Sequence, residues 1–508
     1  MDQKIMDLAE KYRPLAVELL AEAIRIPADH VDRDPELGGD PDCGLSNHEG
    51  PRLEYLRRRI VEIGAVEKAE DAGFDEFGNL VWTVEDRGDG VPADEKVVVF
   101  MDGHTDTVKA LRPRWTEALG GIDCYDGLVD PAKVDKEFLK GELGYLPPEE
   151  EWSYLVFGRG SADQLSGVIS QIIATKIQLE LRGEGALRGV FVKSYGTVTE
   201  EDNDGGGPMY VMQKELAGAA PGAIPDVVLL TEGTGDAEKG AVGLYRGQRG
   251  RMQIEVEVTG KSCHGSMPWE GRNPLEYGAT IIAEAAERYR DGQGFLDDAF
   301  LGGGTRTASF AALDTPSDCA VPERFTFRFD RRLTAGEEPD RALEDVENLA
   351  TVRRARDAGL RIEVRAPFYD RKTWRGYTPG NPQIYPGWVT PEDHPSVSAV
   401  VEAYKRVASP RIAAGGTKGA LRKEPRVDRW IFSTDGVGYP VPRSSGPFEV
   451  SPAKRWIDSG SLHHPAMLGI GPGIEQNTHK IGECMDSREF PIAAALLARF
   501  PSLYTEMR

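Results

Sequence analysis

Short apolar runs rich in β-branched residues alternate with helix-like segments along the first half of the chain. The runs occupy residues 80–84, 96–101, 189–194 and 226–230. Residues 167–181 form one of the helix-like segments between them. This alternation is typical of βαβ units, in which helices cover the faces of a parallel sheet. We therefore expect an α/β fold with a mixed, mostly parallel sheet flanked by helices, including two N-terminal helices over residues 2–26 and 50–63.

The pattern changes around Gly247. From there on, apolar and polar residues alternate along the expected strands in place of the continuous apolar runs. Such alternation indicates antiparallel strands with one exposed face. The strands and helices expected in this part of the chain cover residues 251–258, 274–289, 324–329, 338–359 and 360–365. Their β-α-β-β-α-β-like order suits a separate, ferredoxin-like α+β domain.

The chain of 508 residues exceeds what one hydrophobic core usually supports. We predict a first domain built from residues 1–246 and 369–508, interrupted by an inserted domain over residues 247–368, which is called the lid below. The charged, Gly- and Pro-rich segment 111–151 is expected to be a further insertion. It lies either near the mouth of a functional site or on the surface without a role.

Acidic residues outnumber basic residues by 83 to 61, which gives a formal net charge of −22. This charge opposes contact with a phosphate backbone or an anionic membrane, so neither nucleic acid nor a membrane is expected as a partner. No apolar run approaches the roughly 18 residues of a membrane span. The five cysteines are odd in number and form no C-x-x-C pair, which favours reduced thiols and a cytoplasmic location.

The first motif with chemical potential is the buried-strand pattern 97–101, which is followed by His104 and Asp106. Ligands of open α/β sheets bind beyond the carboxyl ends of the strands. His104 could therefore bind a metal, with Asp106 holding the imidazole by accepting its other N–H. The alternative is a structural histidine with ordinary hydrogen bonds.

The second motif is the Gly-rich segment 158–164, which presents Asp163 just before an apolar helix. A carboxylate on such a loop suits a bridging ligand, because each of its oxygens can bind one cation. The alternative is that Asp163 caps the following helix by accepting backbone N–H bonds.

The third motif is the pair Glu200 and Glu201 at the end of an expected strand. Adjacent side chains there point in different directions, so Glu201 can ligate a metal while Glu200 acts as general base on the substrate water. The alternative is an acidic surface turn, which is how we interpret Asp202 and Asp204.

Two more segments each offer a single ligand: Glu232 follows the apolar run 227–230, and His479 lies in a glycine-rich loop. Together the motifs supply two histidines and three carboxylates, namely His104, Asp163, Glu201, Glu232 and His479. This mixed set suits zinc, cobalt or manganese, and the lack of cysteine favours a catalytic over a structural zinc site. Two such ions would polarise a scissile carbonyl and lower the pKa of water toward about 7.

The order and spacing of these motifs resemble the zinc-dependent amidohydrolase and exopeptidase family. That family includes acetylornithine deacetylase, succinyl-diaminopimelate desuccinylase, aminoacylases and glutamate-releasing carboxypeptidases. The resemblance implies two divalent ions, most often Zn²⁺, on a catalytic domain interrupted by a lid that commonly forms a homodimer. It also implies that Asp163 serves both ions, the first with His104 and Glu232 and the second with Glu201 and His479.

The lid motifs 245–251, 262–266 and 330–334 are most similar to the branch of selenium-metabolism-linked hydrolases. In the family, a lid histidine matching His264 reaches the partner's active site and steadies the tetrahedral intermediate. A local hydrogen bond within the lid is the alternative for His264.

The lid also supplies the expected substrate-binding residues. Arg332 matches a lid arginine that, in members of the family, binds a substrate carboxylate. The planar guanidinium suits this role because it can bind both carboxylate oxygens. Its neighbour Arg331 is the alternative, and Asn273 is expected as a second substrate-binding residue.

We predict a metal-dependent hydrolase that cleaves an amide bond in an N-acyl or N-carbamoyl amino acid or a short peptide carrying a carboxylate. Glu200, Asp106 and His264 are its expected catalytic residues. The alternative is a non-catalytic metal- or amino-acid-binding protein that keeps the fold, because fold alone does not prove function. A third hypothesis is a scaffold that uses the lid only for assembly.

Overall fold

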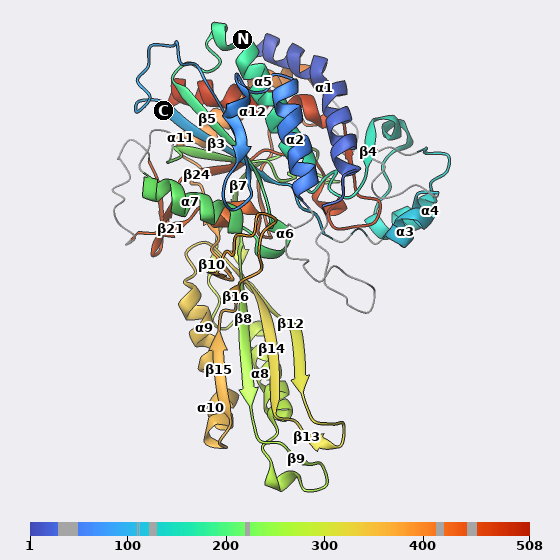
Figure 1. Cartoon of the computed structure of the whole chain (residues 1–508), viewed down its shortest axis with the longest axis vertical. Coiled ribbons are helices and arrows are strands. Elements are labelled where there is room, and N and C mark those ends of the chain that lie inside the picture. Colours follow the sequence, from blue (N-terminus) through green and yellow to red (C-terminus); the bar gives the residue numbers. More distant parts are fainter. Residues whose placement is uncertain are drawn as a thin grey trace.

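The computed structural model describes residues 1–28, 49–108, 110, 112–120, 130–218, 224–412, 421–443 and 455–508. A broad part that contains both termini carries a narrow, elongated projection (Figure 1). Within the described ranges, no helix is long and apolar enough to cross a membrane. Cys263, Cys319 and Cys484 form no disulfide. The expected free thiols of Cys43 and Cys124 lie outside the described residues.

The broad part is built on a nine-stranded sheet in the order β1-β2-β5-β3-β6-β24-β7-β19, with β20 paired to β7. The strands are β1 (Ala72–Phe74), β2 (Leu80–Glu85), β3 (Val97–His104), β5 (Val190–Thr197), β6 (Val227–Leu230), β7 (Leu244–Gln248), β19 (Trp388–Val389), β20 (Val427–Trp430) and β24 (Ala466–Gly469). Its centre, β5-β3-β6-β24, is parallel, whereas β2 and β7 pair antiparallel at the two sides. The expected mixed α/β sheet is confirmed.

The continuous apolar run of β3 is explained by cores on both faces of the sheet. Val97, Val99 and Met101 belong to one buried cluster, while Val98 and Phe100 belong to another. Since successive strand residues point to opposite faces, a strand covered on both sides needs an apolar residue at every position.

Helices supply both coverings of the sheet (Figure 1). The first cluster gathers residues of α1 (Asp2–Ile24), α2 (Gly50–Glu62), α5 (Leu165–Glu180), α11 (Pro395–Val407) and α12 (Glu489–Met507). α7 (Gly206–Gly218) contributes to the second. The two N-terminal helices expected from the sequence are therefore present, each within two residues of its expected end.

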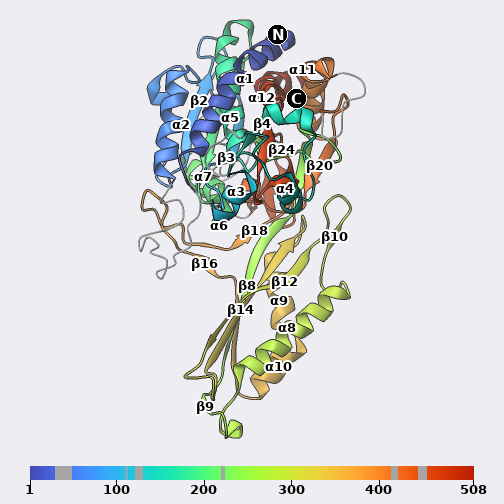
Figure 2. The same ribbon diagram turned by 90° about the vertical axis from the view of Figure 1, so that its right-hand side faces the viewer.

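The projection contains the lid, in which helices cover one face of a separate antiparallel sheet (Figure 2). The sheet has the order β12-β14-β8-β15, with β18 paired to β8. Its strands are β8 (Gly250–Thr259), β12 (Thr305–Asp314), β14 (Arg324–Leu333), β15 (Arg361–Arg365) and β18 (Ile384–Tyr385). The helices are α8 (Pro274–Arg290), α9 (Pro339–Glu347) and α10 (Ala350–Asp357). The expected α+β insertion is confirmed as a fold, and its boundaries at residues 247 and 368 stay a prediction.

The prediction of a single helix over residues 338–359 is wrong, because α9 and α10 are separate helices. Leu349 between them has a non-helical ψ of 140° and a fully buried side chain. The Glu284 carboxylate of α8 accepts hydrogen bonds from the N–H groups of Ala350 and Thr351 at 2.8 and 2.7 Å. These contacts satisfy the first donors of a new helix and so favour a break over continuation.

The segment expected as an insertion forms α3 (Arg112–Ala118) and α4 (Lys136–Leu143) on the surface of the broad part. Leu111 and residues 121–129 lie outside the described residues. The segment has its own buried cluster, which includes Trp115 and Leu139 and extends to Ile481. Lys480 Nζ donates to the Leu143 carbonyl at 3.0 Å, so the insertion packs against the loop that contains His479.

Candidate metal centre

The five ligand candidates converge at the carboxyl edge of the parallel strands. His104 is the last residue of β3, and Glu232 follows β6 by two positions. Glu201 lies in α6 (Glu200–Asn203), shortly after β5. Asp163 precedes α5, and His479 lies between β24 and β25 (Cys484–Asp486). This edge is where parallel sheets commonly place ligand sites.

The side chains form two groups that share Asp163. In the first group, His104 Nε2 lies 3.0 Å from Asp163 Oδ1 and 3.6 Å from Glu232 Oε2. In the second, His479 Nε2 lies 3.0 Å from both Asp163 Oδ2 and Glu201 Oε2. The ligand atoms of each group lie within 4.8 Å of one another. The two oxygens of Asp163 therefore face different histidines.

The charges of the centre fit a pair of divalent cations. Among the described residues, no ion pair joins Asp163, Glu200, Glu201 or Glu232 to a lysine or arginine. Burial raises the pKa of Asp163, but its hydrogen bonds with His104 and His479 outweigh burial and hold that pKa well below its usual range. Burial and the nearby charge of Asp163 raise the pKa of Glu232 to about 7. A buried carboxylate cluster of this kind needs compensating positive charge, which metal ions supply.

Glu200 faces the centre without being part of either group. Its Oε2 lies 3.7 Å from His104 Nε2, and its side chain is buried. Burial is the main reason that the pKa of Glu200 lies well above its ordinary value.

Asp106 contacts His104 through both its backbone and its side chain. His104 Nδ1 lies nearest the backbone carbonyl of Asp106, at 3.0 Å, and 3.4 Å from its carboxylate. The Asp106 carboxylate instead accepts the N–H groups of Glu200 and Glu201, both at 3.1 Å. The carboxylate thus satisfies free donors at the start of α6 while lying beside the imidazole, and its role in orienting His104 stays a prediction.

Two residues without a role in the sequence prediction also shape the centre. The carboxylate of Glu483 accepts three backbone N–H bonds from the loop that ends in Asp163 and pairs with Arg159. Gln164 Nε2 donates to Glu232 Oε2 at 2.9 Å. Gln164 directly follows Asp163, and Glu483 lies in the same loop as His479. The sequence does not reveal, however, which residues these two side chains contact.

A cavity of about 450 Å³ opens on the centre and extends to the lid. Arg332 lines it, as expected for a substrate-binding residue, but its guanidinium is paired with both oxygens of Asp330 at 2.8 and 3.1 Å. Arg332 Nη1 also donates to Ser433 Oγ at 3.2 Å. The cavity therefore presents paired charges beside the metal centre.

The interpretation of Asp204 as a surface acid is wrong. Asp204 is buried, lines the cavity and accepts a hydrogen bond from Arg251 Nη1 at 2.6 Å. Arg251, which lies 47 positions further along the chain, provides the opposite charge that offsets the cost of burying this carboxylate. Asp202 is partly exposed and pairs with Arg371 at 3.2 Å, as a surface acid does.

The other predicted lid residues do not reach the centre of their own chain. His264, in β9 (Cys263–His264), lies at the far tip of the lid and is exposed (Figures 1 and 2). The side chain of Asn273 accepts N–H bonds from Leu275 and Glu276 at the start of α8. Arg331 is buried and pairs with Glu337. Arg332 and Arg251 line this cavity, whereas Arg331 does not.

Comparisons with known proteins agree with this architecture. A family model described as the peptidase dimerisation domain matches residues 246–357. The chain is 31% identical over 497 residues to the uncharacterized protein YgeY of Escherichia coli K12, with 98% of this chain and 96% of YgeY covered.

Solved structures show the same fold at low sequence identity. The di-peptidase Dug1p of Saccharomyces cerevisiae has a TM-score of 0.60 and 12% identity, covering 100% of this chain and 99% of that one. The M20 family metallo-carboxypeptidase Sso-CP2 of Sulfolobus solfataricus has a TM-score of 0.57 and 14% identity, covering 96% and 99%. With the full-length similarity to YgeY and the matched dimerisation domain, these findings show that the chain belongs to the M20 peptidase family.

Proposed function

We propose that this protein is a dinuclear metal-dependent hydrolase that cleaves an amide bond next to a carboxylate. The observation that carries the proposal is the position of Asp163, whose two oxygens each lie 3.0 Å from a different histidine. One group would consist of His104, Asp163 and Glu232, and the other of Asp163, Glu201 and His479. Nitrogen and oxygen ligands of this kind suit Zn²⁺, with Co²⁺ or Mn²⁺ as substitutes.

The chemistry divides between the metals and the chain. When bound, the two ions supply Lewis acidity toward the scissile carbonyl and the attacking water. Glu200 takes a proton from that water at its carboxylate and delivers it to the departing nitrogen. The position of Glu200 supports this role, because its buried Oε2 lies 3.7 Å from the ligand atom His104 Nε2 without belonging to either ligand group.

Arg332 is the proposed anchor for the substrate carboxylate. It lines the cavity that opens on the metal centre, and its guanidinium can bind a carboxylate in a bidentate manner. Asp330 already occupies this fork in the free protein, so a substrate carboxylate has to compete with Asp330. Asn273 remains a proposed substrate contact, and in the free protein its side chain caps α8.

We further propose that the protein works as a homodimer joined through the lid. The matched domain is a dimerisation domain, and β12 is an edge strand with Phe310 and Leu313 exposed. A partner's His264 could then reach a neighbouring centre, which its own chain's geometry does not allow. The finer placement in the selenium-metabolism-linked branch rests on the lid motifs alone.

A substrate panel with one substitution tests the catalytic proposal. Zinc- or cobalt-loaded protein is expected to hydrolyse a member of a panel of N-acetyl amino acids, N-carbamoyl amino acids and dipeptides. Glu200→Gln should lose about 10²- to 10⁴-fold in kcat with both metals retained, whereas the exposed Glu70→Gln should behave as wild type. Full activity in Glu200→Gln would contradict the role of Glu200. Tight ligand binding with no hydrolysis across the panel would instead indicate a non-catalytic binding protein.

A further inference from the structure

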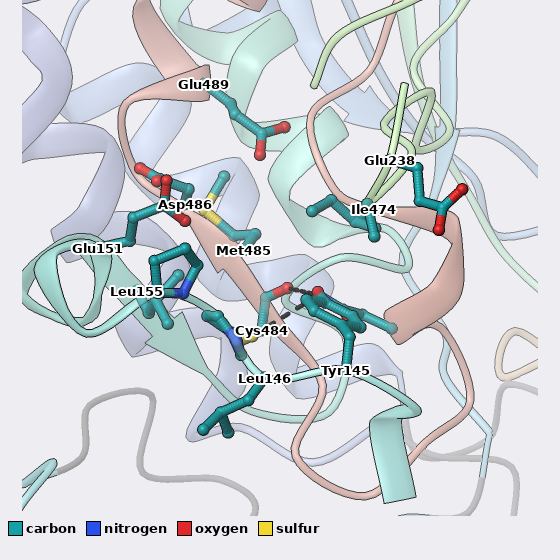
Figure 3. Close-up of a pocket in the computed structure, with 14 residues that line it drawn as sticks. Tyr145, Leu146, Glu151, Leu155, Glu238, Ile474, Cys484, Met485, Asp486 and Glu489 are labelled. Carbon is teal, nitrogen blue, oxygen red and sulfur yellow. Dashed lines mark hydrogen bonds between the residues drawn. The ribbon is translucent and has the colours of Figure 1, made fainter. Parts of the chain in front are cut away.

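A second cavity, of about 180 Å³, lies between the inserted segment and the loop that contains His479 (Figure 3). One wall comes from residues 145–155 of the chain, which follow α4. The others come from Ala237 and Glu238, from residues 474–477, and from β25 with the first residue of α12. None of the five ligand candidates lines it, so it is distinct from the metal centre.

The lining combines apolar walls with one sign of charge. Leu155, Ile474 and Met485 provide apolar surface. The charged side chains of the lining are all acidic: Glu151, Glu238, Asp486 and Glu489. The nearby guanidinium of Arg488 is already engaged, since it hydrogen-bonds both oxygens of Asp486 and lies 3.4 Å from Glu151. Arg488 thus pairs with two of these acids, whereas Glu238 and Glu489 form no ion pair with a lysine or arginine of the described residues.

Glu489 is the buried carboxylate on which the case for a ligand depends. It is only 3% exposed and lines the cavity. Its Oε2 accepts the Gly473 N–H at 2.8 Å, whereas its Oε1 has no hydrogen-bond partner among the described residues. Burial and the charge of Asp486 raise the pKa of Glu489 to about 8. A carboxylate that is almost fully buried is costly to ionise, and a cationic donor beside it would lower that cost.

The carboxylates of this cavity do not form a metal site. The side chains of the described residues gather into metal-sized groups only at the two sets around Asp163. The apolar walls also offer nothing to an inorganic ion, which prefers oxygen on all sides. A cavity of about 150 Å³ can hold a molecule the size of benzene, so this volume suits a ligand of about six heavy atoms.

We propose that this cavity binds a small organic ammonium ion, with its N–H groups donating to Glu489 and its apolar body resting on Leu155, Ile474 and Met485. The ring of Tyr145 also lines the cavity and adds to its apolar surface. The ligand class follows from the combination of acidic oxygens with apolar surface. The ammonium group of a simple amine would bind the oxygens, and its alkyl chain would contact the apolar side chains.

An occupant would also act on the metal centre through the loop that it touches. Tyr145 donates its hydroxyl hydrogen bond to Asn477, and Asn477 donates to the Cys484 carbonyl at 2.8 Å. Asn477 lies two residues before His479, and Cys484 directly follows Glu483, which fixes the Asp163 loop. A ligand in this cavity therefore stabilises the loop that contains one metal-ligand candidate.

Calorimetric titration of the zinc-loaded full-length protein with butylammonium chloride tests the proposal. We expect saturable binding of one equivalent, with butanol and sodium butyrate at least about tenfold weaker, because neither carries the charged donor. Glu489→Gln should weaken butylammonium binding at least about tenfold, while the exposed Glu70→Gln should leave it unchanged.

A second variant keeps the test decisive if Glu489→Gln does not fold. Ala237→Leu adds volume at a residue that lines the cavity and should also abolish the binding. Binding that persists in both variants would place the amine elsewhere, for example at the metals. That result, the absence of saturable binding, or equal affinity for butanol would overturn the proposal.

Discussion

The carboxylate of Glu483 accepts a hydrogen bond from the backbone N–H of Asp163 at 3.0 Å. The same oxygen also accepts the N–H groups of Gly160 and Ala162, and the other oxygen pairs with Arg159 at 2.6 Å. All of these groups are buried, so the contacts are made in a low-dielectric interior. One carboxylate thus fixes the loop from which Asp163 faces both histidines.

Glu483→Gln should weaken zinc binding by about 10- to 100-fold, the usual range for residues that orient metal ligands. The amide keeps the size of the side chain but has a single acceptor oxygen for four donors. Competition with a chromogenic chelator measures the affinity. Glu284→Gln is the matched control, because Glu284 also accepts two backbone N–H bonds but lies in the lid. Equal zinc affinity of Glu483→Gln and wild type would contradict the role of Glu483.

Arg332→Ala should raise the KM for a carboxylate-bearing substrate by at least about tenfold, with a smaller effect on kcat, because it removes a bidentate charged contact. Steady-state kinetics on the best substrate of the panel provides the measurement. Arg328→Ala is the control, since Arg328 lies on the same strand but pairs with Glu255 outside the cavity. An unchanged KM would exclude Arg332 as the carboxylate anchor.

Replacing both Phe310 and Leu313 by Asp should abolish the dimer, because two charges on an exposed edge strand oppose pairing with a second sheet. Light scattering after gel filtration gives the mass in solution. Leu296→Asp introduces a charge at another exposed apolar residue of the lid and should leave the dimer intact. A double variant that remains dimeric would place the interface elsewhere.

The buried side chain of His464 leads us to predict how the free energy of unfolding depends on pH. Burial lowers the pKa of His464 from 6.5 to about 4. As the pH falls from about 6.5 to about 4, the unfolded chain therefore takes up a proton that the folded chain does not, and the free energy of unfolding decreases. The contribution is about 1.4 kcal/mol per pH unit within this window.

His464→Gln lacks this titration, so its stability should fall less steeply than that of wild type between pH 6.5 and pH 4. Urea unfolding at several pH values measures the two slopes, and the comparison does not depend on the absolute stability of the variant. Identical slopes would show that His464 does not remain neutral in the folded protein.

The sequence predicts the metal centre better than it predicts the surroundings of that centre. His104 ends one strand, and Glu201 and Glu232 follow two others. The apolar pattern of each strand is local, and the parallel arrangement brings the strand ends together. Burial of Asp204 depends on Arg251, and the break before α10 depends on Glu284. Such pairings join distant segments, so no local pattern reveals them.

Asp106 illustrates the same limit at the level of one side chain. Its place two residues after His104 indicates a supporting role, and the structure does put it there. Which of its atoms contacts the imidazole depends on the N–H groups of Glu200 and Glu201, which compete for the carboxylate. The spacing alone cannot resolve that competition.

The most direct test of the shared Asp163 is anomalous X-ray scattering from crystals of the zinc-loaded protein at the zinc edge. We predict two peaks, one among His104, Asp163 and Glu232 and the other among Asp163, Glu201 and His479. No peak at this position, or a single peak that Asp163 does not contact, would contradict a dinuclear centre.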